Sequence, residues 1–168
     1  MGSNIQPIIQ GASIGGWEEA YTWQFPEGAS QSFLIGAPLT MSSGGVVIVS
    51  SVTAPAIAGI ALSKATGTTG SATAPALPVI MPYQEVVFSV CVDTTTTNNT
   101  AALGTGYPSQ FTIGSSYQML KDSTSGNYYM GSGTGSPVFQ LLSYDPSVAS
   151  TINARVNVRI LTSQIFWT

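Results

Sequence analysis

The sequence predicts an all-β protein, a small β-barrel or sandwich of about eight to ten short strands with an extended N-terminal arm. Three observations favour this fold. Several segments alternate apolar and polar residues with a period of two, as expected for strands with one buried face. The 18 glycines and 10 prolines, with many serines and threonines, interrupt these segments at short intervals. No amphipathic helical pattern extends beyond about two turns.

The clearest strand patterns are 85–92, which is strongly apolar, and 153–161, which alternates. In the alternating segment, valines fall on one face and Arg155 and Arg159 on the other, so we expect one buried and one hydrated face. The small apolar residues of 56–62 allow either a strand or one helical turn, and Gly59 disfavours the helix. Further strands are expected at 21–25, 33–35, 45–52, 76–81, 116–120, 127–130 and 138–144.

The composition changes near residue 32. Residues 1–32 are rich in glycine and contain Trp17 and Trp23, two of the three tryptophans. We therefore predict two parts, an extended N-terminal arm over 1–32 and a β-barrel domain over 33–168.

The arm contains a dense group of aromatic residues. Alternation in 21–25 places three of them on one face of a short strand. Aromatic side chains at such density are enriched at protein interfaces. Three alternatives remain open: the face packs on the chain's own barrel, a neighbouring protein covers it, or it stacks against a sugar. The candidate partner-binding residues are Trp17, Tyr21, Trp23, Phe25 and Phe33.

Charged residues are sparse. They make up 7% of the chain, against roughly 25% in an average globular protein. Because a free protein normally keeps charges on its surface, we infer that partners cover much of this one or that serine and threonine coat it. The net charge of −3 and the four scattered basic residues argue against a nucleic-acid partner.

The chain has no histidine and one cysteine, Cys91. A Ser-His-Asp or Cys-His catalytic arrangement is therefore impossible, and a zinc site lacks its usual ligands. Two carboxylates alone can hydrolyse a glycoside, but the adjacent Glu18 and Glu19 would point to opposite faces of a strand. We predict a protein that is not an enzyme, with no catalytic residues, no metal site and no cofactor. Cys91 lies in an apolar segment and is expected to be a small buried hydrophobe.

No signal peptide or membrane span is expected. The N-terminus lacks a basic region followed by a long apolar run. The longest apolar run, 54–62, includes Pro55 and Gly59 and falls short of the roughly 18 residues of a span.

The order of short apolar motifs resembles that of tailed-phage head decoration proteins, which are capsid cement proteins. The motifs are 33–39 (FLIGAPL), the Gly-Gly turn at 44–45, 57–62 (IAGIAL), 77–79 (LPV), 139–142 (FQLL) and 156–160 (VNVRI). The resemblance covers roughly residues 33–168 and includes no catalytic signature.

This resemblance implies a structural virion protein of a bacteriophage. Such a protein binds the outer surface of an icosahedral capsid and stabilises it by bridging capsomers. The implied partners are the major capsid protein and further copies of the chain, as a dimer or trimer, without nucleic acid or membrane. The implied location is the capsid exterior, after synthesis in the host cytoplasm. The alternatives are another virion β-domain, in a minor capsid or tail-associated protein, and a glycan-binding β-sandwich that uses Trp17 or Trp23.

Overall fold

A computed structural model describes residues 6–8, 22–42, 47–50, 52, 56–67, 76–83, 86–94 and 105–167. The described residues form β-strands and three single-turn 3-10 helices, so the prediction of an all-β protein is confirmed. The strands are β1 (Gln6–Ile8), β2 (Thr22–Pro26), β3 (Pro38–Met41), β4 (Val47–Val49), β5 (Gly59–Ala61), β6 (Ala76–Ile80), β7 (Val87–Asp93), β8 (Ser116–Lys121), β9 (Tyr128–Gly131), β10 (Pro137–Ser143) and β11 (Arg155–Ile160). The 3-10 helices are η1 (Pro108–Gln110), η2 (Pro146–Val148) and η3 (Thr162–Gln164).

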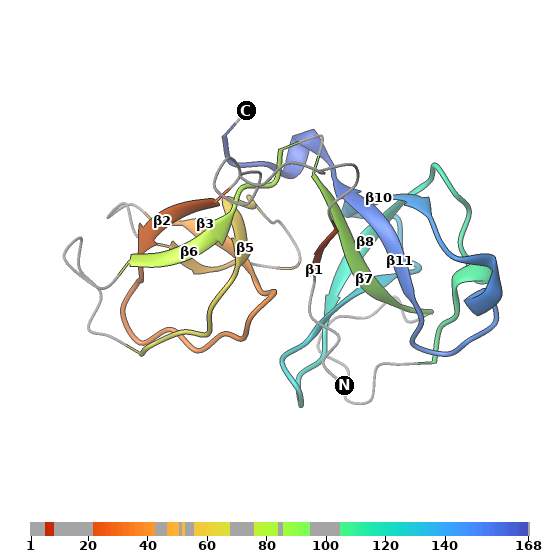
Figure 1. Cartoon of the computed structure of the whole chain (residues 1–168), viewed down its shortest axis with the longest axis horizontal. Coiled ribbons are helices and arrows are strands. Elements are labelled where there is room, and N and C mark those ends of the chain that lie inside the picture. The colour runs from red at the N-terminus through yellow and green to blue at the C-terminus, as the bar shows by residue number, and fades with distance from the viewer. Residues whose placement is uncertain are drawn as a thin grey trace.

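The strands divide between two sheets that lie side by side (Figure 1). One sheet has the order β2-β6-β5-β3-β4, and the other has the order β1-β7-β11-β10-β8-β9. We call the first sheet and its connections, residues 22–80, the first lobe. We call β1 and β7 to β11, with their connections, the second lobe. The predicted barrel is thus built as two small curled sheets, and the chain passes once from the first to the second between β6 and β7.

The second lobe is closed. Its pairings run from β7 through β11, β10, β8 and β9, and β9 pairs in turn with β7. The closing pair is parallel and joins Cys91–Asp93 to Tyr129–Gly131, while β1 pairs with the earlier half of β7. A closed ring of strand pairs leaves no free edge on these five strands, which stabilises a small barrel.

The first lobe curls in the same way. All its strand pairs are antiparallel, and an isolated bridge joins Glu27, at the end of β2, to Val47, at the start of β4. Gly28 N–H also donates to Val47 O at 2.8 Å. The two terminal strands of this sheet therefore meet at one point.

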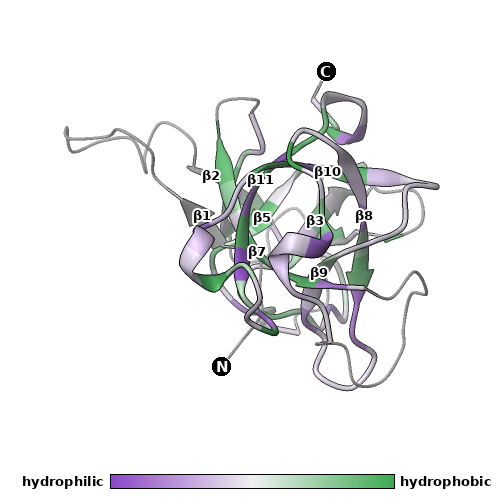
Figure 2. Cartoon of the chain, turned by 90° about the vertical axis from the view of Figure 1, so that its right-hand side faces the viewer, coloured by the Kyte–Doolittle hydropathy of each residue, from purple (hydrophilic) through white to green (hydrophobic). Residues whose placement is uncertain are grey.

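Apolar side chains from both sheets form the main core, as expected for strands with a period of two. Cys91, Leu120 and Tyr129 form a second, small cluster in the second lobe. In β11, Val156, Val158 and Ile160 are buried, whereas Arg159 is exposed. Hydrophobic residues lie mainly along the strands and hydrophilic residues mainly in the connections (Figure 2). The predicted two-faced character of 153–161 is thus confirmed.

After β11 the chain crosses from the second lobe to the first, above both sheets in Figure 1. Ile165 forms a parallel bridge with Ile57, just before β5. Ile57 N–H donates to Gln164 O at 2.7 Å, and Phe166 N–H donates to Ile57 O at 3.0 Å. We call residues 162–167 the C-terminal segment. It ties the last strand of the second lobe to the centre of the first.

The predicted strand at 33–35 is wrong. Residues 31–34 have no regular structure, and a turn follows, in which Ala37 N–H donates to Leu34 O at 3.1 Å. Gly36 has a φ of 83°, a left-handed conformation that glycine adopts without strain. The strand begins only at Pro38, and proline is tolerated as the first residue of a strand. The short strand β1 was not predicted.

Part of the predicted arm belongs to the first lobe. β2 pairs with β6 over all five of its residues, from Thr22 to Pro26. The described residues of the arm are 6–8 and 22–32. The division of the chain at residue 32 stays a prediction. No helix in the described ranges is long and apolar enough to cross a membrane.

The close approach of β5 and β6 depends on a glycine. A Cβ on Gly59 would lie 2.8 Å from the carbonyl oxygen of Ile80 and would also overlap the Val79 side chain. We expect Gly59→Ala to lower the free energy of unfolding by about 2 kcal/mol because the strands must separate. Gly135→Ala is the control, since no atom lies within 4 Å of the position of its Cβ. Equal denaturant midpoints for the two variants would contradict this packing.

Candidate functional site

The structure separates the predicted partner-binding residues. Trp17 and Tyr21 lie outside the described residues. Trp23 in β2 is 62% exposed, whereas Phe25 and Phe33 are 8% and 7% exposed and belong to the core. The side chain of Phe25 therefore packs within the chain's own core. Among the three predicted residues that the structure describes, Trp23 presents a large apolar surface to solvent.

An aromatic cluster lies where the C-terminal segment meets the first lobe. The ring of Trp167 stacks on that of Phe25, with centroids 5.7 Å apart and an interplanar angle of 12°. Phe166 packs edge-on against Trp167 at 4.9 Å. The indole N–H of Trp167 donates to the carbonyl oxygen of Ala58 at 2.9 Å. Trp167 therefore covers the core with one ring face while 41% of its surface remains exposed.

Other exposed apolar side chains are distributed over both lobes. In addition to the tryptophans and Phe166, they are Leu34, Ile35, Tyr83, Ile113 and Ile152. Single exposed apolar residues are normal on a protein surface. In this chain they accompany an unusually low number of charges, so the described surface offers apolar contacts with few ionic ones.

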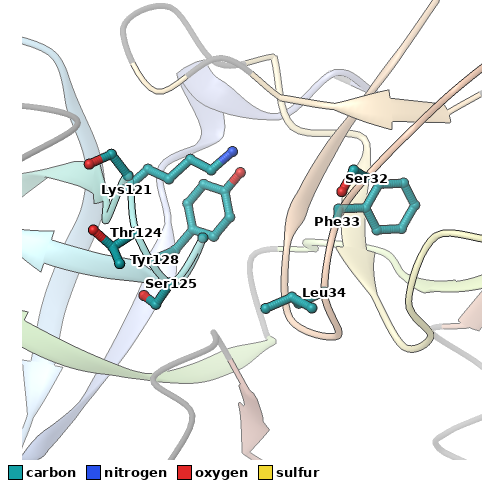
Figure 3. Close-up of a pocket in the computed structure, with 9 residues that line it drawn as sticks. Ser32, Phe33, Leu34, Lys121, Thr124, Ser125 and Tyr128 are labelled. Carbon is teal, nitrogen blue, oxygen red and sulfur yellow. The ribbon is translucent and has the colours of Figure 1, made fainter. Parts of the chain in front are cut away.

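A pocket of about 300 Å³ lies between the lobes (Figure 3). The first lobe contributes the loop from Ser32 to Leu34, and the second lobe contributes Lys121, the turn 123–126 and Tyr128. The two walls differ in chemistry. Phe33 and Leu34 are apolar, whereas the opposite wall carries an ammonium group and several hydroxyls.

Tyr128 has an unusual environment in this pocket. Its side chain is buried, and its hydroxyl has no hydrogen-bond partner among the described residues. Burial raises the pKa of this phenol to about 12. The ammonium of Lys121 lies 5.6 Å from the centroid of its ring, in a cation–π arrangement.

We expect Tyr128→Phe to raise the free energy of unfolding by about 1 kcal/mol at neutral pH, because a buried hydroxyl without a partner costs desolvation energy. The raised pKa adds a second expectation. The neutral phenol is favoured in the folded protein. The wild type therefore keeps its full stability below pH 10, and it loses stability between pH 10 and about 12, where Tyr128 ionises more readily in the unfolded chain than in the folded protein. Alkaline denaturation curves of the wild type and Tyr128→Phe test this. An identical loss of stability in both proteins above pH 10 would contradict it.

The buried carboxylates serve as hydrogen-bond acceptors for the backbone. Glu27 accepts from the N–H and hydroxyl of Thr66, at 2.8 and 2.6 Å, and from the N–H of Gly67 at 2.9 Å. Burial raises the pKa of Glu27, but these hydrogen bonds outweigh it and hold the pKa below its usual value. Asp122 accepts from the N–H groups of Thr124 and Ser125, and its pKa is lowered in the same way against the effect of burial.

The two arginines are used within the second lobe. Arg155 donates to the hydroxyl and carbonyl oxygens of Ser89, at 2.8 and 2.7 Å. Arg159 donates to the side-chain oxygen of Gln140 at 2.7 Å. Cys91 is buried and free, as predicted, and burial raises the pKa of its thiol more than Arg155 lowers it. Within the described ranges, no three His, Cys, Asp or Glu side chains gather as metal ligands would.

Comparison with protein-family models, with curated proteins and with solved structures found no match. The fold therefore defines the class, an all-β protein of two small curled sheets, and the comparisons add no family to it.

Two features of the site were not found from the sequence. Phe166 and Trp167 were identified only as the end of the chain, and their contacts with Ala58 and Phe25 depend on the crossing of the C-terminal segment. The pocket joins Phe33 to Tyr128, and no short-range pattern links two loops so far apart in sequence.

Proposed function

We propose that this chain is a structural virion protein that binds the outer surface of an icosahedral phage capsid and stabilises it by bridging capsomers. The motif order that resembles head decoration proteins supports the proposal, over roughly residues 33–168. The proposed partners are the major capsid protein and further copies of this chain, as a dimer or trimer on the shell.

One observation carries the proposal furthest. Trp23 exposes 62% of its surface on a strand of a packed sheet, in a chain with very few charges. Exposed tryptophans are enriched among the residues that dominate protein–protein binding energy. A cement protein needs contact area and complementary shape, and these follow from a rigid β scaffold with apolar side chains on its surface.

The use of the polar groups is compatible with a role that needs no chemistry. Glu27 and Asp122 accept hydrogen bonds from backbone N–H groups, and Arg155 and Arg159 donate to residues of neighbouring strands. Groups held in this way rigidify the two lobes. A rigid scaffold reduces the entropy lost on binding, which favours many weak contacts repeated over a shell.

The test is uptake of the purified protein by phage shells that lack it. We expect saturable co-sedimentation, and a rise in the temperature at which the shells disrupt. Trp23→Ala should weaken uptake by about tenfold, since a central tryptophan contributes more than about 1 kcal/mol to an interface. Shells that take up no protein, or that take it up without any gain in heat stability, would overturn the proposal.

A glycan-binding role is the second candidate, because an exposed tryptophan such as Trp23 can also stack against a sugar ring. Quenching of tryptophan fluorescence by an oligosaccharide, abolished in Trp23→Ala, would support this role. Its absence across a glycan panel would remove the candidate.

A further inference from the structure

The pocket between the lobes combines three features that together point to a ligand. It is lined by Lys121, whose ammonium makes no ion pair with any described residue. It is lined by Tyr128, whose buried hydroxyl has no hydrogen-bond partner in the described chain. Its opposite wall presents the apolar side chain of Leu34, next to Phe33 and Ser32. Such a buried polar group without a partner is rare in native structures.

The chemistry of the polar wall favours an anion. Lys121 and the Tyr128 hydroxyl both supply protons for hydrogen bonds, and Ser123, Thr124 and Ser125 add further hydroxyls. The nearest carboxylate in sequence, Asp122, does not line the pocket, and its Oδ1 accepts from two N–H groups of the turn. The positive charge of Lys121 is therefore available to a ligand.

The size of the pocket and the chemistry of its second wall, formed by the first lobe, narrow the class of ligand. A pocket of about 300 Å³ is at the lower end of ligand-binding cavities and is too large for a carboxylate group alone. Leu34 lies across the pocket from the polar wall, whereas the ring of Phe33 points away from that wall and packs in the core (Figure 3). A carboxylate on a short aliphatic stem matches both walls, because its methylenes can contact Leu34 while its oxygens reach Lys121. A small shift of the Tyr128 side chain, whose hydroxyl is closed off from solvent here, would add a second donor.

We propose that this pocket binds a carboxylate on an aliphatic stem, supplied by an acidic side chain of the partner protein. The identity of that partner rests on the proposed function, whereas the carboxylate specificity does not. The positive charge of Lys121 favours an acidic residue as the ligand. Because the pocket lies between the lobes, binding of this residue depends on how the lobes are arranged.

The test is a titration of the full-length protein, monitored by backbone amide NMR signals of 121–128 and of Phe33 and Leu34. The probes are a blocked tripeptide with a central glutamate, the same tripeptide with glutamine, and sodium acetate, all at constant ionic strength. We expect the glutamate peptide to shift these signals saturably with a millimolar Kd, and the glutamine peptide and acetate to bind at least about tenfold more weakly.

Two variants locate the site. Lys121→Met keeps the stem and removes the charge, and Tyr128→Phe keeps the ring and removes the hydroxyl. We expect losses of about tenfold and about fivefold in affinity for the glutamate peptide. Lys64→Met is the matched control, because Lys64 is exposed and does not line the pocket, and it should leave the affinity unchanged.

Several results would overturn the proposal. Equal binding of the glutamate and glutamine peptides would remove carboxylate specificity, and an equal loss in Lys64→Met would remove the site. Acetate binding as tightly as the glutamate peptide would make a free small acid the ligand and overturn a side chain of a partner as the source. A protein that binds shells but not the peptide would overturn this inference alone, whereas one that binds the peptide but not shells would overturn the proposed function.

Discussion

We expect Trp167→Ala to lower the free energy of unfolding by about 3 kcal/mol. The substitution removes a ring stacked on Phe25 at 5.7 Å and the indole N–H bond to Ala58 at 2.9 Å. It also removes an anchor of the C-terminal segment, which joins the lobes through the bonds of Phe166 N–H and Gln164 C=O to Ile57. Chemical denaturation followed by circular dichroism measures the loss.

The control for this prediction is another tryptophan. Trp23 is 62% exposed, so Trp23→Ala should change the free energy of unfolding by less than about 0.5 kcal/mol. The two substitutions should then separate the roles of the two residues, with Trp167 needed for stability and Trp23 for binding to the shell. If Trp167→Ala unfolds at the same denaturant concentration as the wild type, the C-terminal segment does not hold the lobes together.

A loss of about 3 kcal/mol is also expected for Glu27→Gln. Glu27 is fully buried and accepts three hydrogen bonds from Thr66 and Gly67, which fix the end of β2 against the loop after β5. An amide keeps one acceptor oxygen but turns an NH2 group toward donors that need an acceptor. Thermal or urea unfolding at neutral pH measures the difference.

The pH dependence of the stability that Glu27 contributes follows from the direction in which its pKa is shifted. The pKa of Glu27 in the folded protein lies below its usual value of 4.5, since the Thr66 and Gly67 hydrogen bonds outweigh the opposing effect of burial. Its charge therefore stabilises the fold above pH 4.5, and this contribution is lost as the pH falls through the folded-state pKa. The stability of the wild type should approach that of Glu27→Gln in acid.

Asp145→Asn is a suitable control for the acid effect. Asp145 is exposed and accepts one N–H bond from Ser147 at the start of η2. Asparagine caps a helix about as well as aspartate, so Asp145→Asn should change the free energy of unfolding little at any pH. A gap between wild type and Glu27→Gln that stays constant down to pH 2 would show that the charge of Glu27 contributes nothing.

The sequence predicted the strands with strong patterns better than the strands defined by long-range contacts. The segments 85–92 and 153–161 became β7 and β11 because valine-rich or alternating residues favour one pleated arrangement. The segment 33–35 became a loop because Gly36 turns the chain there. The arrangement as two curled sheets depends on pairings such as β7 with β9, which no local pattern encodes.

In the candidate site, too, the features that depend on long-range contacts could not be predicted from the sequence. Alternation correctly placed aromatic residues in β2, but Trp23 is exposed while Phe25 is buried and stacked under Trp167, which is far away in sequence. The burial of Cys91 was predicted correctly from its apolar neighbours in sequence, although the residues that pack with it, Leu120 and Tyr129, come from β8 and β9. The pocket arises only when the loop at Phe33 meets the turn after β8.

We propose that this chain works by binding a shell through exposed apolar side chains on a rigid scaffold. The most direct measurement is the equilibrium binding of the wild type and Trp23→Ala to isolated capsids that lack the protein. We expect saturable binding of the wild type at a fixed number of copies per shell, and binding about tenfold weaker for a fully folded Trp23→Ala. Equal binding by the two proteins, or no binding by either, would contradict it.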